Sequence, residues 1–80
     1  MFGMALKYII TRYSPIVFSS SEKHSEVAKG LGDIESAGFL IITVDENKKM
    51  VCSVYGESIS LKVKSHPDDK IKLERMLNNH

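Results

Sequence analysis

Residues 39–64, FLIITVDENKKMVCSVYGESISLKVK, constrain the fold of this chain more than any other stretch. Residues 39–44 form a run of apolar and β-branched side chains, which is typical of a central strand with both faces covered. The polar residues 45–48 predict the turn of a β-hairpin, and residues 49–55 predict the returning strand. Three consecutive strand segments therefore organise this half of the chain.

The third segment, residues 58–64, alternates strictly between apolar and polar side chains. In a strand, successive side chains point to opposite faces, so Ile59, Leu61 and Val63 are expected to face the core. Glycine and glutamate at positions 56 and 57 predict the tight connection that precedes it. We therefore expect a three-stranded meander with one apolar face and one open polar face.

The N-terminal part predicts a strand over residues 7–13, because Tyr, Ile and Thr favour extended structure. Ser14 and Pro15 interrupt it, since proline cannot donate to the ladder of hydrogen bonds. Residues 16–18 are expected to resume an extended path, either at a sheet edge or after a bend.

Two helices are predicted. Ser19 as N-cap and Glu22 three residues later match a capping box, and the glycines at positions 30 and 32 predict the end of this first helix. Residues 33–38 are expected to be a connector. The second helix opens at residues 66–69, where a proline and two acidic residues suit a helix N-terminus. The expected inward stripes are His24, Val27, Ala28 and Leu31 in the first helix, and Leu73, Met76 and Leu77 in the second.

These elements predict an α+β fold in a single domain over residues 1–80. We expect a two-layer sandwich in which a mixed or antiparallel sheet of about four strands carries two helices on one face, in the order β-(β)-α-β-β-β-α. Residues 1–4 are expected to be disordered or a non-native start. The predicted core comprises Val27, Leu31, Phe39, Ile41, Val54, Leu61, Val63, Leu73 and Leu77.

Size and composition narrow the classes of function. A single core in a chain of 80 residues is thin, and such domains often gain stability from disulfides, metals or a partner subunit. Cys52 is the single cysteine, so an intrachain disulfide is excluded. Neither the three histidines nor His66 with Asp68 and Asp69 predicts a metal site, and no cofactor is expected. By elimination, self-association becomes the favoured source of extra stability.

The remaining composition bears on location and partners. A net charge of +1 argues against binding to nucleic acid by bulk electrostatics. The N-terminus lacks the features of a signal peptide, and no run of residues reaches the length of a membrane span. We therefore expect a cytoplasmic protein without a membrane partner.

The open polar face is the first candidate binding surface. Its hydroxyl groups, aromatic ring and ammonium groups suit a protein partner, a second copy or, as an alternative, a single-stranded nucleic acid; a solvated face is the simplest interpretation. The exposed edge of residues 58–64 is a further route to pairing, and Ile71 is an apolar residue on the outer side of the last helix. The candidate binding residues are Ser53, Tyr55, Ser58, Ser60, Lys62, Lys64 and Ile71.

His24 and Cys52 are the candidates for chemistry. A partly buried histidine can act as a base or a pH switch, although a histidine packed at the rim of the core explains His24 equally simply. Cys52 lies in mid-strand, where an inert buried thiol is expected. A small enzyme or metabolite binder built around these two residues is the third hypothesis, and no catalytic residue is assigned. The sequence thus favours a non-catalytic protein-interaction module that associates with itself.

Overall fold

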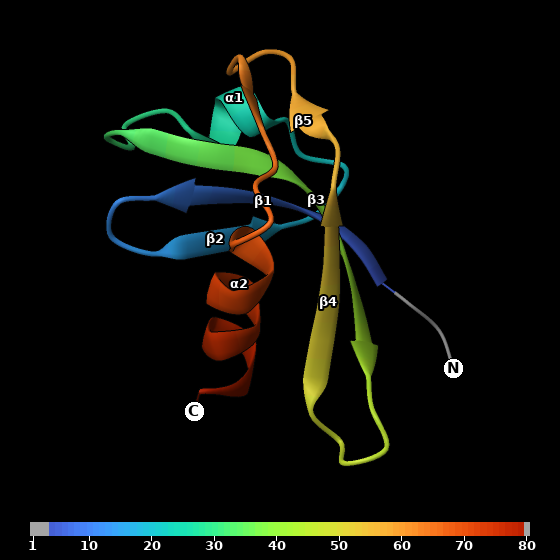
Figure 1. Cartoon of the computed structure of the whole chain (residues 1–80). Coiled ribbons are helices and arrows are strands. Elements are labelled where there is room, and N and C mark those ends of the chain that lie inside the picture. The colour runs from blue at the N-terminus through green and yellow to red at the C-terminus, as the bar shows by residue number, and fades with distance from the viewer. Residues whose placement is uncertain (1–3, 80) are drawn as a thin grey trace.

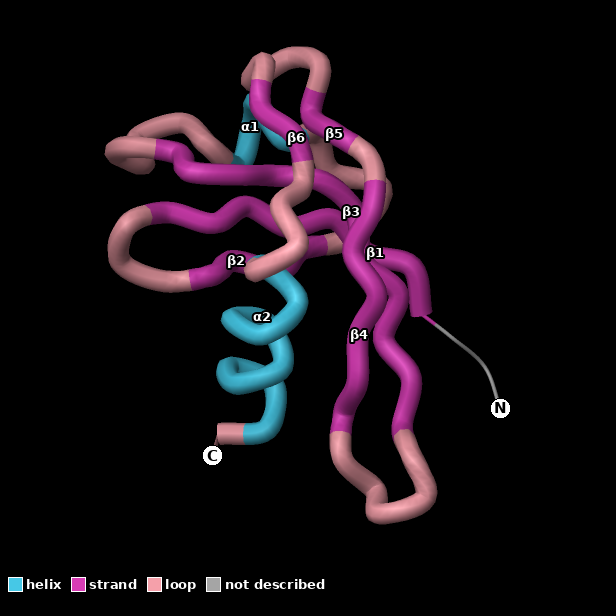
Figure 2. The backbone as a smooth tube through the Cα atoms, in the orientation of Figure 1, coloured by secondary structure: helices cyan, strands magenta, loops and turns pink. Residues whose placement is uncertain are grey.

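The computed structural model describes residues 4–79. A four-stranded antiparallel sheet, a second two-stranded sheet and two helices confirm the predicted α+β class (Figure 1, Figure 2). The elements in chain order are β1 (Met4–Thr11), β2 (Pro15–Phe18), α1 (His24–Val27), β3 (Ile34–Val44), β4 (Met50–Tyr55), β5 (Glu57–Ser58), β6 (Val63–Lys64) and α2 (Asp69–Asn78).

The main sheet has the strand order β2-β1-β3-β4, and β5 pairs with β6 in the smaller sheet. The 11-residue strand β3 lies between β1 and β4, so the prediction of a central strand in this region is confirmed. The predicted β3–β4 hairpin is also present, and it extends away from the rest of the molecule (Figure 1). Met4 pairs with Ile42 at the start of β1, whereas the remaining N-terminal residues of the expected disordered start, 1–3, lie outside the described residues.

Strand alternation divides the side chains of the main sheet into two sets. The first set forms the main core, where Tyr8, Leu40 and Cys52 are buried beneath Leu73 of α2. The second set includes the buried residues Ile9 and Ala37. The two sets define the two faces of the sheet, and α2 covers the first of them.

The short helix α1 contributes to the second set. The imidazole of His24 lies 5.5 Å from the ring of Phe18 and 5.6 Å from the ring of Phe39, edge-on to both. Phe18 and Phe39 both pair with Lys7, whose side chain alternates with that of the buried Tyr8. The expected packing of both helices on one face is therefore seen only in part: α2 packs on the first face of the sheet, and α1 contacts side chains of the second face.

The first helix differs from its prediction. It is a single turn that begins after Lys23, and Ser19 caps no helix. Instead, the Ser19 side chain accepts a hydrogen bond from the N–H of Ser21 (3.2 Å), and its carbonyl accepts one from Glu22 (3.0 Å). Serine side chains that bond to nearby backbone groups compete with helix formation, which explains the turn at this position.

The predicted connector at residues 33–38 is instead the first half of β3, with Ser36, Ala37 and Gly38 buried. These small residues have low strand propensity, but the space around them is limited. A Cβ atom on Gly38 would lie 2.7 Å from the carbonyl oxygen of Tyr55. Close packing against β4 and the following segment therefore favours glycine in this strand.

The predicted strand over residues 58–64 is also wrong. Residues 59–62 form a turn between β5 and β6, in which the Ser58 side chain accepts a hydrogen bond from the N–H of Leu61 (3.3 Å). Lys62 adopts a left-handed conformation with a φ of 59°, which a continuous strand does not contain. The turn breaks the expected alternation, because Ile59 of the apolar set is 83% exposed whereas Ser58 of the polar set is 2% exposed.

The core prediction is corrected accordingly. Leu73 is fully buried as expected, but Ile41 is 37% exposed. Ile59, which the alternation directed inward, is 83% exposed at the turn. Leu61 and Val63 are half-buried, as are Val27, Leu31, Phe39, Val54 and Leu77. The fully buried apolar side chains that the prediction missed are Tyr8, Ile9, Ile10, Ala37, Leu40 and Cys52.

Candidate functional site

A buried polar cluster lies where α2 begins. The carboxylate of Asp69 accepts hydrogen bonds from the Tyr8 hydroxyl (2.6 Å), the Ser36 hydroxyl (2.8 Å) and the backbone N–H of His66 (2.8 Å). Tyr8 is fully buried and Asp69 is 1% exposed. Three donors directed at one carboxylate match an ionised acceptor in the first turn of a helix, where negative charge is favoured.

Each member of this cluster comes from a different element. Tyr8 lies on β1, Ser36 lies on β3 and Asp69 is the first residue of α2. Burial, the hydrogen bond to Asp69 and the charge of its carboxylate raise the pKa of Tyr8 far above the usual value. The phenol therefore remains a protonated donor at neutral pH, so the cluster acts as a fixed connection between the sheet and the helix.

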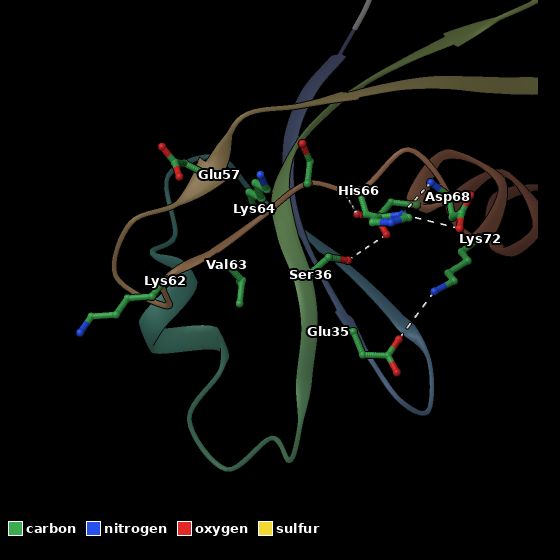
Figure 3. A pocket seen from close by; sticks show the side chains of 11 residues that line it. Glu35, Ser36, Glu57, Lys62, Val63, Lys64, His66, Asp68 and Lys72 are labelled. Atoms are coloured by element: carbon green, nitrogen blue, oxygen red, sulfur yellow. Dashed lines mark hydrogen bonds and ion pairs between the residues drawn. The ribbon is translucent and has the colours of Figure 1, made fainter.

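A cleft of about 520 Å³ opens beside this cluster (Figure 3). Its walls carry charges of both signs: Lys72 lies 3.6 Å from Glu35, and Lys64 lies opposite Glu57 in the register of β5 and β6. Figure 3 shows the side chain of Lys62 pointing away from the other lining residues. Acidic and basic side chains are thus mixed in the lining of this cleft, and neither sign of charge dominates it.

The histidine of the cleft is held locally. The Nδ1 atom of His66 accepts a hydrogen bond from the backbone N–H of Asp68 (3.2 Å). The Asp68 carboxylate lies 3.6 Å from the same nitrogen, which is beyond hydrogen-bond distance. Within residues 4–79, no group of His, Cys, Asp and Glu side chains has the arrangement of a metal site.

The candidate binding residues separate into three places. Ser53 and Tyr55 are exposed on β4, Ile71 is 59% exposed on α2, and Ser60, Lys62 and Lys64 belong to the β5–β6 hairpin. Ser58 is only 2% exposed, so it does not contribute to an open surface. The lysines and the aromatic ring of Tyr55 therefore do not form the continuous strand face on which the nucleic-acid alternative was based.

His24 and Cys52 do not meet. His24 is 6% exposed, and its Nε2 atom donates a hydrogen bond of 2.9 Å to the carbonyl oxygen of Gly38. Cys52 belongs to the core beneath α2, and its thiol contacts the carbonyl oxygen of Lys70. Burial raises the pKa of the Cys52 thiol, which disfavours a thiolate nucleophile. The two side chains belong to opposite faces of the sheet, so they do not form a joint site of the kind that the third hypothesis requires.

One side of the main sheet has a region that no other element of residues 4–79 covers, and we call it the open face; it shares only Ser53 and Tyr55 with the candidate binding residues predicted from the sequence. It comprises side chains of the β1, β3 and β4 strands that alternate with the core set, namely Ala5, Ile41, Thr43, Val51, Ser53 and Tyr55. Ile41 and Tyr55 are 37% and 44% exposed. The Tyr55 ring stacks on Phe39 at a centroid distance of 5.5 Å, which holds it in place at one end of the region.

Sequence reasoning identified Ser53 and Tyr55 on this side of β4 but assigned Ile41 to the core. The run of apolar residues in β3 predicts coverage on both faces, whereas α1 covers only the end near Phe18 and Phe39. The sequence predicted a longer first helix, and the actual length of α1 decides how much of this face is covered. A single turn is too small to cover a sheet of this width, so the outer half of the face stays open.

The chain matches no protein-family model, no curated protein and no solved structure. In residues 4–79, neither helix has the length and apolar content that crossing a membrane requires. The physical properties of the surfaces therefore provide the basis for a functional proposal.

Proposed function

We propose that this protein is a non-catalytic interaction module of the cytoplasm that associates with a second copy of itself through the open face. The observation that carries this proposal is the exposure of Ile41 and Tyr55 on the part of a sheet face that α1 leaves uncovered. Clustered apolar side chains on a surface favour association, because burying them removes apolar area from water.

The charge of the open face favours a second copy as the partner. The six residues that define it are uncharged. In a two-fold dimer the same surface meets itself, so a charge near the axis would lie close to its own copy and repel it. Lys7, which borders this region, donates from its ammonium group to the carbonyl oxygen of Glu22 at 2.7 Å and is therefore directed toward the α1 side.

Size provides a second argument. The fully buried apolar side chains in the described part of the chain number seven, and Cys52 has no disulfide partner. A small core of this kind gains stability when a partner covers a further apolar surface. In a dimer formed through the open face, the second copy would cover the part of the sheet that the single turn of α1 leaves exposed.

The experiment combines sedimentation velocity with thermal unfolding over a range of protein concentrations. We expect a dimer whose melting temperature rises with concentration, because association stabilises the folded state by mass action. The variant Ser53→Lys adds a positive charge on the open face next to Ile41 without removing an apolar side chain, and it is expected to yield monomers. Ile41→Lys should have the same effect.

Ile71→Lys is the matched control. Ile71 is more exposed than Ile41 but lies on the outer side of α2, so its replacement should leave the dimer intact. Circular dichroism would verify that all three variants are folded. A wild-type protein that sediments as a monomer at every concentration contradicts the proposal. A dimer that only Ile71→Lys dissociates also contradicts it, because the interface would then be formed by α2.

A further inference from the structure

The outer edge of β4 is hydrogen-bonded to side chains of α2. Strand β4 ends the order of the main sheet, so its outer backbone groups have no neighbouring strand there. The N–H of Met50 donates to Oδ1 of Asn78 (2.8 Å), and the Nδ2 atom of Asn78 donates to the carbonyl oxygen of Met50 (2.8 Å). The N–H of Cys52 donates to Oε2 of Glu74 (2.8 Å). Side chains of a helix thus occupy three positions that a further strand would use.

The Asn78 contact reproduces the pairing of a strand in detail. In an antiparallel ladder, a hydrogen-bonded pair of residues exchanges two N–H···O bonds. The carboxamide of Asn78 supplies the same acceptor and donor to Met50 that the backbone of such a residue supplies. A third bond, from Nδ2 of Asn78 to the carbonyl oxygen of Glu74 (2.9 Å), orients the carboxamide.

The spacing of the two helical residues fits the spacing of the strand. Glu74 and Asn78 are four residues apart, which corresponds to about 6 Å along a helix. Met50 and Cys52 are two residues apart, which corresponds to about 6.8 Å along an antiparallel strand. Side chains on one face of α2 therefore meet successive outward groups of β4.

The sequence of β4 contains no protection of its own. Its residues, MVCSVY, include neither a charged side chain nor a proline, the devices by which natural edge strands avoid pairing with other chains. The opposite edge strand, β2, begins with Pro15 and has only four residues. Protection of the β4 edge therefore depends on α2.

We propose that Glu74 and Asn78 act as a substitute strand, which keeps the edge of β4 from pairing with β4 of a second copy. A second copy is the partner that fits, because antiparallel pairing about a two-fold axis brings this uncharged strand against itself without repulsion. The surface is the edge of the sheet and differs from the open face. The inference therefore goes beyond the proposed function and is independent of it.

The test uses the double variant Glu74→Ala/Asn78→Ala of the full chain. Alanine favours helix, so weaker contact with β4 cannot arise from a lower helix propensity of α2. Amide hydrogen exchange is expected to become about tenfold faster at Met50 and Cys52, as the loss of a hydrogen bond predicts. The amides of Val51 and Ser53 point toward β3 and should keep their protection. Sedimentation should show an associated species that the wild-type protein does not form.

A third substitution identifies the surface that pairs. Met50→Pro removes an outward N–H of β4 but none that bonds to β3, so it blocks edge pairing while the β3–β4 ladder persists. Added to the double variant, it should restore the sedimentation of the wild-type protein. Arg75→Ala, at an exposed position of the same helix, is the matched control and should change neither exchange nor sedimentation.

The same comparison in the Ile41→Lys background separates this association from any dimer formed through the open face. Fast exchange at Met50 and Cys52 without association would overturn the proposal, as would association that Met50→Pro does not reverse. If the double variant does not fold, Asn78→Ala alone provides a milder change. It should accelerate exchange at Met50 but not at Cys52, and unchanged exchange at both amides would also overturn the proposal.

Discussion

The hydroxyl of Tyr8 donates a hydrogen bond of 2.6 Å to Oδ2 of Asp69, which lies 61 residues further along the chain. The Ser36 hydroxyl donates to the other carboxylate oxygen, Oδ1, at 2.8 Å. A single buried carboxylate thus connects β1 and β3 to the first turn of α2. Helix α2 also covers the core and the edge of β4. The hydrogen bonds of Asp69 therefore position the helix that covers both of these regions.

Tyr8→Phe should lower the free energy of unfolding by about 1–3 kcal/mol, because it removes a donor from a buried carboxylate while keeping the ring. Chemical denaturation at neutral pH measures this change. Tyr13→Phe is the control, since Tyr13 is 83% exposed in the β1–β2 turn, and it should have no measurable effect. Equal stability of the Tyr8→Phe and wild-type proteins would show that the hydrogen bond to Asp69 makes no net contribution.

Alkaline pH should weaken the same connection. The folded-state pKa of Tyr8 is raised above that of an unfolded tyrosine, which is about 10. The stabilisation is therefore fully present below pH ~10 and is lost as the pH rises toward the folded-state pKa. The wild-type protein should lose stability above pH ~10 more steeply than Tyr8→Phe in parallel denaturation curves. Parallel pH profiles of the two proteins would refute this assignment.

Acidic pH should weaken the contact between α2 and β4. Burial opposes ionisation of Glu74, but hydrogen bonds from Lys70 and from the N–H of Cys52 outweigh it and lower the pKa of the carboxyl group. Its stabilisation is present above the unfolded pKa of about 4.3 and is lost as the pH falls through the lower folded-state value. Glu74→Gln should cost about 0.5–1 kcal/mol at pH 7, and this difference should disappear in strong acid. A difference independent of pH would argue against a role for the charge.

His24→Phe should destabilise the protein by about 1–3 kcal/mol. Phenylalanine retains a ring between Phe18 and Phe39 but cannot donate to the carbonyl oxygen of Gly38, which loses its partner. His24→Ala should cost more, because it also removes the ring from a buried site. Thermal unfolding of the two variants compares these effects, and a His24→Phe variant as stable as the wild type would show that packing alone explains His24.

Gly38→Ala should destabilise the sheet by about 1–3 kcal/mol, as overpacked sites do. The added methyl group would meet the backbone oxygen of Tyr55 at 2.7 Å, so β4 or the segment after it must shift. Gly32→Ala is the control, because no atom lies within 4 Å of the added Cβ atom. Denaturant unfolding should rank the variants in that order, and a tolerated Gly38→Ala would mean that the end of β4 moves easily.

The sequence alone determined the elements whose signals are local. The β3–β4 turn was predictable because Asp45 organises it within a few residues: its Oδ1 atom accepts hydrogen bonds from the N–H groups of Asn47 (2.8 Å) and Lys49 (2.9 Å). The proline at position 15 marked the break between β1 and β2 in the same way. In α2, the spacing of Leu73 and Ile71 correctly separated the buried side from the exposed side, because helical periodicity depends only on sequence distance.

The tertiary structure decided the features that depend on distant neighbours. Ser36 and Gly38 belong to a strand because Asp69 and the backbone of Tyr55 adjoin them, although their own propensities predict a loop. Residues 58–64 alternate as a strand does, yet the polar group of Ser58 stabilises a turn within them. The open face and the covered β4 edge likewise depend on how far α1 and α2 extend over the sheet. A local sequence pattern indicates which secondary structure a segment prefers. Whether a surface is covered depends instead on contacts between residues far apart in the chain.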